Sequence, residues 1–347
     1  MTGLQRCMAV LRGEKPDRVP VVPSITNFAI WHNGYQMKDV VRDADKLVDC
    51  MVRCCEEFGF DGLEFVLDTA VSPETLGTKV AFRDDEPATC VAGAITRYEQ
   101  VKDLPITDPH KDGRIPVYLR TIEQLHKKLG DQVLVVNSIG QAPFSFACMV
   151  RGMEEFLLDL HAMKKDLSPI HRLIDHCEVC LERIARAYVD TGTHMVYCGD
   201  ALASFDVVSP QTYETMAYPA EKKLADYVRS LDLYFGIHIC GNNGPILSRL
   251  VQTGADMLDV DYKTDLDLCH NVVGHQAVVR GTLDPSSAFR FGTPEHIDEL
   301  SRHNIETFTA DGGRFFLNAG CDIMAGTPPE NIRAMVHAAQ NYNPFCN

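Results

Sequence analysis

The sequence predicts a single (β/α)8 TIM barrel, with residues 1–347 in one domain. Three observations support this fold class. Eight short β-rich runs recur along the chain, most of them are nearly continuous in apolar residues, and an amphipathic segment follows each run. Continuous apolar runs are typical of parallel strands covered on both faces, and eight strand–helix units complete one closed barrel.

The eight predicted strands are 18–23, 62–67, 132–138, 194–199, 233–239, 256–260, 277–281 and 314–320. Helix starts are indicated where a serine or threonine precedes a proline, at Ser209, Thr293 and Thr327, and Glu330 completes a capping box at the last of these. Two further runs, 77–82 and 93–101, predict a hairpin insertion after the second strand.

Composition restricts the class of protein. Hydrophobic residues make up 45% and charged residues 23% of the chain, which is ordinary for a globular enzyme. The net charge of −15, with no basic run, argues against nucleic-acid or anionic-membrane partners. No stretch suits a membrane span and the N-terminus has no signal-like apolar region, so we expect a cytoplasmic protein. Its thirteen cysteines are then expected to be reduced, which suits an anaerobic or strongly reducing host.

In a (β/α)8 barrel, the residues that follow the strands gather on the catalytic face. Because His238 and Cys240 are two residues apart, their side chains are expected on the same side of the fifth strand. The side chains with chemical function at such positions are Asp200 after the fourth strand, His238 and Cys240 at the end of the fifth, Asp261 after the sixth, Asp284 after the seventh and Cys321 after the eighth.

One histidine and two cysteines on this rim predict a zinc site. Thiolate and imidazole ligands suit Zn²⁺ in a tetrahedral site, and three protein ligands, His238, Cys240 and Cys321, leave one position open for a substrate. Taken singly, each residue is more often a packed core side chain, so only their shared rim favours a metal. Asp261 is a candidate fourth ligand or an orienting partner of His238, and both interpretations stay open.

Four segments carry a family resemblance: "RCMAVLRGEKPDRVPVVP" at 6–23, "HICG" at 238–241, "GTLDPSSAF" at 281–289 and "NAGCDIMAGTPPENIRAMVHAA" at 318–339. With them, essentially the whole chain resembles the uroporphyrinogen decarboxylase superfamily. More narrowly, it is similar to the zinc-dependent corrinoid methyltransferase branch, whose most specific mark is an H-x-C pair with a distant cysteine.

The resemblance implies a cofactor and a partner. In that branch the H-x-C histidine and cysteine and the cysteine after the last strand hold zinc, and here these are His238, Cys240 and Cys321. An acidic residue after the sixth strand is a further ligand in some relatives, and Asp261 takes that place. A separate small corrinoid protein is implied as the partner whose cobalt exchanges the methyl group. A homodimer is left open.

The resemblance supports porphyrinogen decarboxylation less well than methyl transfer. Decarboxylases carry an arginine-rich segment after the first strand, where this chain has "SITNFAIWHNGY" at 24–35 without any arginine. The aromatic residues Phe28, Trp31 and Tyr35 in that segment predict a smaller, partly apolar substrate, with Asp284 as a further substrate-binding candidate.

The predicted activity is methyl transfer from a small methyl ether, such as a methoxylated aromatic, to the corrinoid. Zinc would serve as the Lewis acid, and Asp200 or Asp261 would hold the substrate or assist proton exchange. Three alternatives remain: the reverse transfer from methylcorrinoid to a thiol, metal-free uroporphyrinogen decarboxylation, and a non-catalytic protein that docks a corrinoid module.

Overall fold

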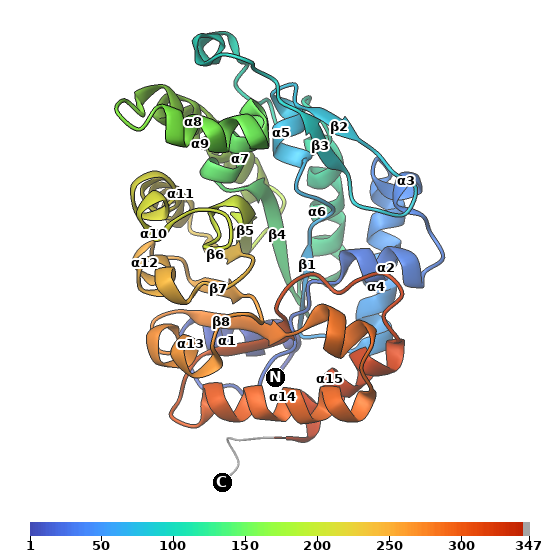
Figure 1. Ribbon diagram of the computed structural model, residues 1–347. Helices are drawn as coiled ribbons and strands as arrows, with labels where there is room; N and C mark the ends of the chain where they lie inside the picture. Colours follow the sequence, from blue (N-terminus) through green and yellow to red (C-terminus); the bar gives the residue numbers. More distant parts are fainter. Residues whose placement is uncertain (343–347) are drawn as a thin grey trace.

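The computed structural model describes residues 1–342. Its centre is a curled sheet of seven parallel strands in which neighbours along the chain are also neighbours in the sheet (Figure 1). The strands are β1 (Gly62–Phe65), β4 (Leu134–Gln141), β5 (Met195–Gly199), β6 (Tyr234–Ile239), β7 (Met257–Val260), β8 (Val278–Leu283) and β9 (Phe315–Ala319). Seven of the eight predicted strands therefore form, each within a few residues of its expected bounds.

Residues 18–23 do not form the predicted first strand. They lie between the two edge strands and make only isolated bridges, with Val21 facing Leu317 of β9 and Ser24 facing Glu64 of β1. Pro20 and Pro23 explain the difference, because proline has no backbone N–H and interrupts a continuous ladder. Their carbonyl groups still accept hydrogen bonds from Leu317 and Glu64, so this segment is bonded to both edges of the sheet.

Helices connect successive strands and cover the outer face of the sheet (Figure 1). They are α1 (Gly3–Leu11), α2 (Thr26–His32), α3 (Met37–Val40), α4 (Ala44–Phe58), α5 (Val71–Thr75), α6 (Ile115–Leu129), α7 (Pro143–Arg151), α8 (Met153–Ala162), α9 (Ser168–Val189), α10 (Pro210–Thr212), α11 (Tyr218–Ser230), α12 (Leu247–Gln252), α13 (Leu266–Val273), α14 (Pro294–Thr309) and α15 (Pro329–Asn341). None of the described helices is both long and apolar enough to cross a membrane.

Two of the three predicted helix caps form. Ser209 accepts a hydrogen bond from the Thr212 N–H, and Thr293 caps α14 in the same way. The prediction at Thr327 is wrong: α15 starts one residue later, with Pro328 at the N-cap, and the Thr327 hydroxyl is buried without a partner among the described residues.

A two-stranded antiparallel sheet, β2 (Lys79–Ala81) with β3 (Thr89–Ala92), lies between β1 and β4 in the sequence. The first predicted run, 77–82, contains β2, but the second, 93–101, contains no strand. The backbone N–H groups of Ala94 and Ile95 instead donate to the Val150 carbonyl at the end of α7. Docking against α7 therefore replaces pairing with β2.

Two hydrophobic clusters reflect the two faces of the sheet. The larger cluster fills the space between the outer face and the helices. The smaller one lies inside the curve and includes Leu134, Met195, Met257 and Phe316, with Cys7 from α1. Alternate residues of each strand thus face opposite clusters, as the period of two in a strand requires.

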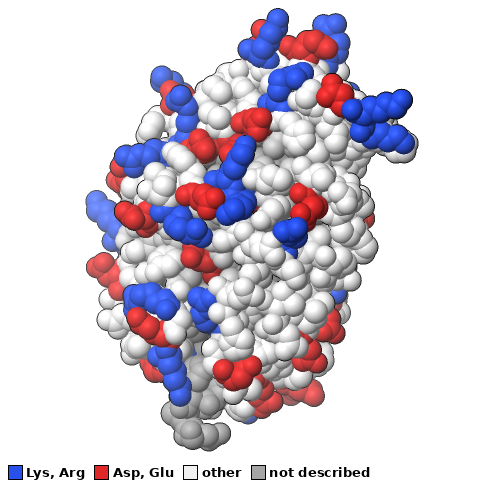
Figure 2. Space-filling view, turned by 90° about the vertical axis from the view of Figure 1, so that its left-hand side faces the viewer, with Lys and Arg blue, Asp and Glu red and all other residues white. Residues whose placement is uncertain are grey.

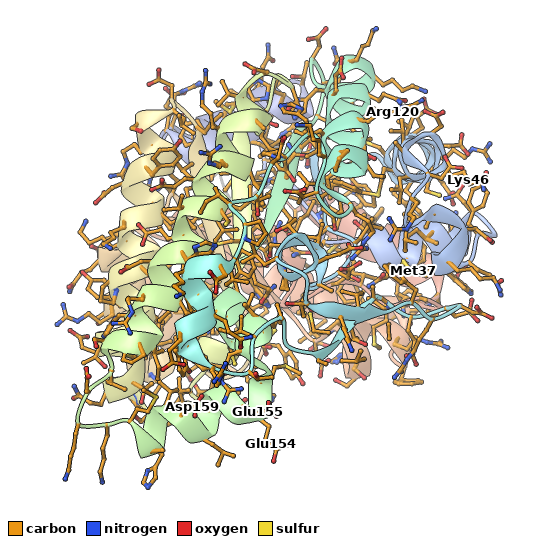
Figure 3. All side chains as sticks on the ribbon, turned by 90° about the horizontal axis from the view of Figure 1, so that it is seen from above. Met37, Lys46, Arg120, Glu154, Glu155 and Asp159 are labelled. Atoms are coloured by element: carbon orange, nitrogen blue, oxygen red, sulfur yellow. The ribbon has the colours of Figure 1, made fainter. Side chains whose placement is uncertain are left out.

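The charged surface is mixed in sign. On the face that α8 to α13 cover, basic and acidic side chains are interspersed (Figure 2). Seen from above, Arg120 and Lys46 lie on one side of the molecule, and Glu154 and Glu155 of α8 lie on the other (Figure 3). Arg120 of α6 contacts Asp45 of α4 at 3.1 Å and so joins these two outer helices.

Candidate metal centre and adjoining cavity

Three metal-ligating side chains meet at the carboxyl ends of the strands. His238 lies on β6, Cys240 follows it directly, and Cys321 comes two residues after β9. Their ligand atoms all lie within 4.8 Å of one another, and His238 Nε2 is 3.0 Å from Cys240 Sγ. The structure therefore brings together the three residues that the sequence singled out for zinc.

Two glycines allow this convergence. Gly241 has φ = +86°, a left-handed conformation that turns the chain sharply after Cys240. At Gly320 a Cβ atom would lie 2.5 Å from the Tyr262 nitrogen, so only glycine lets the segment before Cys321 approach the loop after β7 this closely.

A buried ionic network holds the histidine from below. His238 Nδ1 donates to the Asp259 backbone carbonyl at 3.0 Å and lies 3.3 Å from the Asp259 carboxylate, which leaves Nε2 facing the sulfurs. Arg280 contacts both Asp259, at 2.6 Å, and Glu64. His238, Asp259 and Arg280 lie in the same layer of the sheet, since Asp259 pairs in register with His238 on one side and with Arg280 on the other.

The pKa values reflect these contacts. The hydrogen bond with Cys321 lowers the pKa of Cys240 despite burial, whereas the same contact together with burial raises the pKa of Cys321 well above its usual range. Burial opposes charge on His238, but hydrogen bonds to Asp259 and Cys321 raise its pKa overall. Arg280 and His238 keep the pKa of Asp259 low although its burial acts in the other direction.

A cavity of about 220 Å³ opens beside the three ligands. Its apolar wall includes Val66, Leu67 and Ala88. Its acidic lining residues are Glu64, Asp68, Asp259 and Asp322, and no lysine or arginine lines it in the described part of the chain.

Three of these carboxylates already have a cationic partner. Arg114 binds Asp68 through two nitrogens, and Arg280 serves Glu64 and Asp259. Asp322 instead accepts hydrogen bonds from two neutral groups, the Ser24 hydroxyl at 3.2 Å and the Asn27 amide at 2.6 Å. Burial, with the nearby Glu64, raises the pKa of Asp322 to about 8.

The structure places the three other predicted rim carboxylates against the protein itself. Asp261 accepts from the backbone N–H groups of Gly241, at 2.8 Å, and Lys263, at 3.0 Å, and it is not part of the three-residue ligand group. Asp284 caps the turn that follows β8 by accepting from the N–H groups of Ser286 and Ser287.

Asp200 is fully buried and points away from the cavity lining. It accepts hydrogen bonds from the Ser145 N–H and hydroxyl groups and interacts with the buried Glu221, to which Tyr213 donates at 2.6 Å. Burial raises the pKa of Asp200 to about 6 and that of Glu221 well above its usual range. The backbone N–H of Asp200 donates to the His238 carbonyl, so Asp200 is hydrogen-bonded to the strand that carries this ligand.

None of the three aromatic candidates lines the cavity. Phe28 is buried against Phe58 of α4, Tyr35 packs on the large cluster, and Trp31 is 46% exposed on the surface. Helix α2 explains this placement, because its period turns Phe28 inward, away from the strand ends. From residues 24–35, Ser24 and Asn27 line the cavity.

Three residues that support the ligands were not predicted from the sequence. Glu64, Asp259 and Arg280 each lie within a mainly apolar predicted strand. A charge inside such a strand needs a buried partner, and three of them at similar depth in neighbouring runs are a readable signal of a buried network. Asp322 carried no comparable signal beyond its position next to Cys321.

Comparisons with known proteins agree on one family and on methyltransferases as similar proteins. The uroporphyrinogen decarboxylase (URO-D) family model matches residues 2–342. The methylcobamide:CoM methyltransferase MtbA of Methanosarcina mazei is 28% identical over 98% of both chains. The methylated-thiol–coenzyme M methyltransferase of the same species is 26% identical over 98% of this chain and 89% of its own. A solved methyltransferase structure from M. mazei has a TM-score of 0.88 at 23% identity and covers 98% of both chains.

Proposed function

The chain belongs to the uroporphyrinogen decarboxylase family, and from this premise we propose that it is a zinc-dependent enzyme that transfers a methyl group from a small methyl ether to the cobalt of a corrinoid protein. Relatives that match over nearly the whole chain support an enzyme of the corrinoid-dependent methyltransferase type. The observation that carries the proposal is a small cavity directly beside one imidazole and two sulfurs, which is lined by carboxylates and, among residues 1–342, by no lysine or arginine.

The donor set fits zinc. Two cysteine sulfurs and one imidazole nitrogen are ligands that Zn²⁺ prefers, and their mutual separations below 4.8 Å suit one shared ion. Held there, zinc would supply Lewis acidity toward the ether oxygen and so improve the alkoxide or phenoxide as a leaving group. His238 is oriented for this role by Asp259, and we assign Asp261 as a positioning residue, because it fixes the turn at Gly241 next to Cys240.

The charge of the cavity favours a substrate without an anionic group. Coenzyme M carries a sulfonate and porphyrinogens carry several carboxylates, and neither finds a lysine or arginine among the lining residues. A volume of about 220 Å³ is also below the usual range for drug-sized ligands, roughly 300–1,000 Å³, and far too small for a tetrapyrrole. A methoxylated phenol fits better, because its ring can lie on Val66 and Leu67 while its hydroxyl donates to Asp322.

We further propose that residues 20–24 complete the curled sheet as an eighth element, so that the chain forms one closed barrel. Backbone hydrogen bonds from this segment to β1 and β9 support closure. A closed barrel would leave the carboxyl-end mouth as the approach for the corrinoid protein, since the cavity lies at that end.

Zinc content is the first test. Wild-type protein should bind one zinc ion at this centre, and Cys240→Ser and Cys321→Ser should each lose it, whereas the control Cys90→Ser, which changes a cysteine outside the group, should keep it. Equal zinc in all four proteins would contradict the assignment of the ligands.

Methyl transfer is the second test. With reduced corrinoid protein, the enzyme should demethylate neutral methoxyphenols faster than methoxybenzoates, and Asp322→Ala, which removes the hydrogen-bond partner of the hydroxyl, should reduce this preference. The reverse reaction is the second candidate, favoured by the names of the relatives. Activity only with methylcobalamin and a thiol, or only with a methylated ammonium compound, would overturn the ether assignment while leaving the zinc centre intact.

A further inference from the structure

A second group of metal-ligating side chains lies at the other end of the sheet. His270 is near the end of α13, His275 lies in the loop before β8, and Asp311 follows α14. Nε2 of His270 and Nε2 of His275 are each 3.1 Å from the same carboxylate oxygen, Asp311 Oδ2, and the three ligand atoms lie within 4.8 Å of one another.

These separations match the corners of a metal coordination shell. Zinc binds histidine nitrogen at about 2.0–2.1 Å and carboxylate oxygen at about 2.0–2.2 Å, which sets the edge of a tetrahedron at about 3.3 Å. Two edges of the present triangle are 3.1 Å long. A divalent ion could therefore contact all three atoms with little movement of the side chains.

The surroundings fix one histidine and leave the others accessible. The His270 side chain is 12% exposed, packs edge-on against Phe308 and comes so close to Gly313 that a Cβ atom there would lie 3.1 Å from its ring. The side chains of His275 and Asp311 are 51% and 55% exposed. The group is thus partly preorganised and open to ions from solvent.

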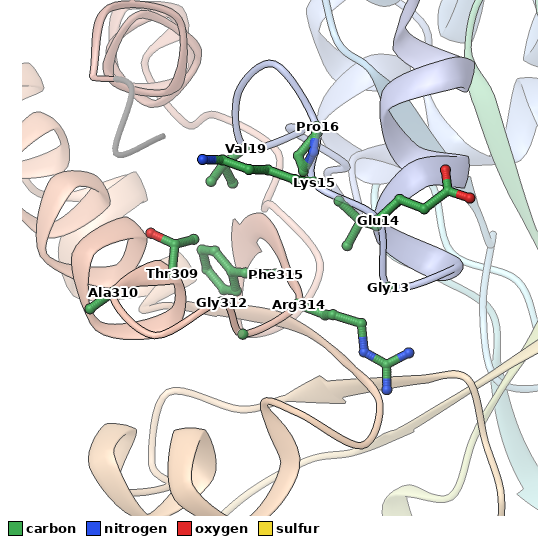
Figure 4. Close-up of a pocket in the computed structure, with 12 residues that line it drawn as sticks. Gly13, Glu14, Lys15, Pro16, Val19, Thr309, Ala310, Gly312, Arg314 and Phe315 are labelled. Atoms are coloured by element: carbon green, nitrogen blue, oxygen red, sulfur yellow. The ribbon is translucent and has the colours of Figure 1, made fainter. Parts of the chain in front are cut away.

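This group is independent of the centre described above. His270 and His275 precede β8 and Asp311 precedes β9, whereas His238 and Cys321 lie at the carboxyl ends of their strands. Because all strands of the sheet run parallel, the two groups lie at opposite ends of the strands. Asp311 lies within residues 309–315, which face residues 13–19 across a separate cavity of about 410 Å³ (Figure 4).

We propose that His270, His275 and Asp311 bind a divalent transition-metal ion, with zinc as the expected occupant, and that this ion joins α13, the start of β8 and the end of α14. Two imidazoles and a carboxylate suit zinc, cobalt, nickel or copper better than magnesium or calcium, which prefer oxygen ligands. Three protein ligands leave at least one position for water.

The ion competes with hydrogen bonding inside the group. Without metal, both rings donate an N–H to Asp311, and with metal each ring must carry its proton on Nδ1 instead. His270 Nδ1 is buried without a hydrogen-bond partner among residues 1–342, which disfavours that form. The site is therefore weaker than the thiolate centre.

The test removes the first centre and measures the second. In a Cys240→Ser/Cys321→Ser background, zinc titration by calorimetry should give one binding event per chain. Adding His275→Ala should weaken this event by more than about 100-fold, beyond the roughly 10–100-fold effect usual for an outer-shell partner. The control His110→Ala, an exposed histidine outside both groups, should not change it. Circular dichroism confirms that each variant is folded.

Cobalt substitution gives an independent readout. Co²⁺ in the same background should show visible absorption without the intense near-ultraviolet bands of cobalt–thiolate bonds, and this absorption should be lost in Asp311→Ala. The proposal is overturned if the double cysteine variant binds no zinc, or if His275→Ala and His110→Ala bind it equally. Neither result depends on whether the thiolate centre binds metal or on the methyltransferase reaction.

Discussion

Replacing Arg280 with methionine should destabilise the protein strongly, although Arg280 touches no substrate in the proposed function. Arg280, Glu64 and Asp259 are each at most 2% exposed, and Arg280 contacts both carboxylates. Methionine removes the positive charge and leaves two buried carboxylates without it. Removing one partner from a buried ion pair costs about 3–5 kcal/mol of unfolding free energy, because an uncompensated charge stays in the interior.

Urea unfolding followed by circular dichroism measures this loss. The matched control is Arg302→Met, which removes an exposed arginine paired with Asp298 four residues away on α14, and which should cost less than about 1 kcal/mol. If Arg280→Met does not fold, Glu64→Gln/Arg280→Met provides the measurement, since it leaves one fewer buried charge and should be more stable than the single variant.

An unfolding midpoint for Arg280→Met close to that of Arg302→Met would refute the reasoning. So would a double variant less stable than the single one. Either result would mean that the two carboxylates do not depend on Arg280 for their charge compensation, and that the network does not support His238 in the way its geometry indicates.

Three further predictions follow from single contacts. Burial lowers the pKa of His126 to about 4, so protonation in the unfolded chain should cost about 2 kcal/mol of stability as pH falls from 7 to 5, and His126→Gln should flatten this dependence in urea titrations. Gly320→Ala should lower the zinc content of the His238–Cys240–Cys321 centre without affecting the distant group of His270, His275 and Asp311, because the added methyl group would meet the Tyr262 backbone nitrogen. Thr293→Ala should cost about 1 kcal/mol through its lost cap, and Thr327→Ala should lower the melting temperature less, because the Thr327 side chain makes no cap bond.

Much of the fold could be predicted because buried parallel strands appear in the sequence as short continuous apolar runs. Apolar runs between polar, amphipathic segments located seven strands, and the family model confirms the resemblance that the residues suggested. The segment 18–23 has the same apolar character but fails as a strand, because Pro20 and Pro23 cannot donate to a ladder. The composition of a run predicts burial, whereas its hydrogen-bonding capacity decides whether it pairs continuously.

The ligand group could be predicted for a related reason. His238, Cys240 and Cys321 take their positions from the ends of β6 and β9, so locating these two strands was enough to place the three residues at one end of the sheet. The aromatic residues of α2 were not constrained in this way. Their direction depends on how the helix packs, and the core position of Phe28 against α4 follows from contacts that no local pattern reveals.

Asp261 shows where the sequence stops being sufficient. A carboxylate after a parallel strand can turn toward a metal or toward backbone N–H groups, and its position at the strand end is the same in both cases. Here the positive φ of Gly241 presents an N–H that needs an acceptor, and Asp261 supplies it at 2.8 Å. Asp261, the candidate ligand, is therefore already hydrogen-bonded to the turn at Gly241 that places Cys240.

Asp261→Asn keeps an acceptor oxygen for this turn, whereas Asp261→Ala does not. If Asp261 acts by positioning, zinc content should survive the first substitution and fall with the second. Equal loss in both variants would return Asp261 to the metal.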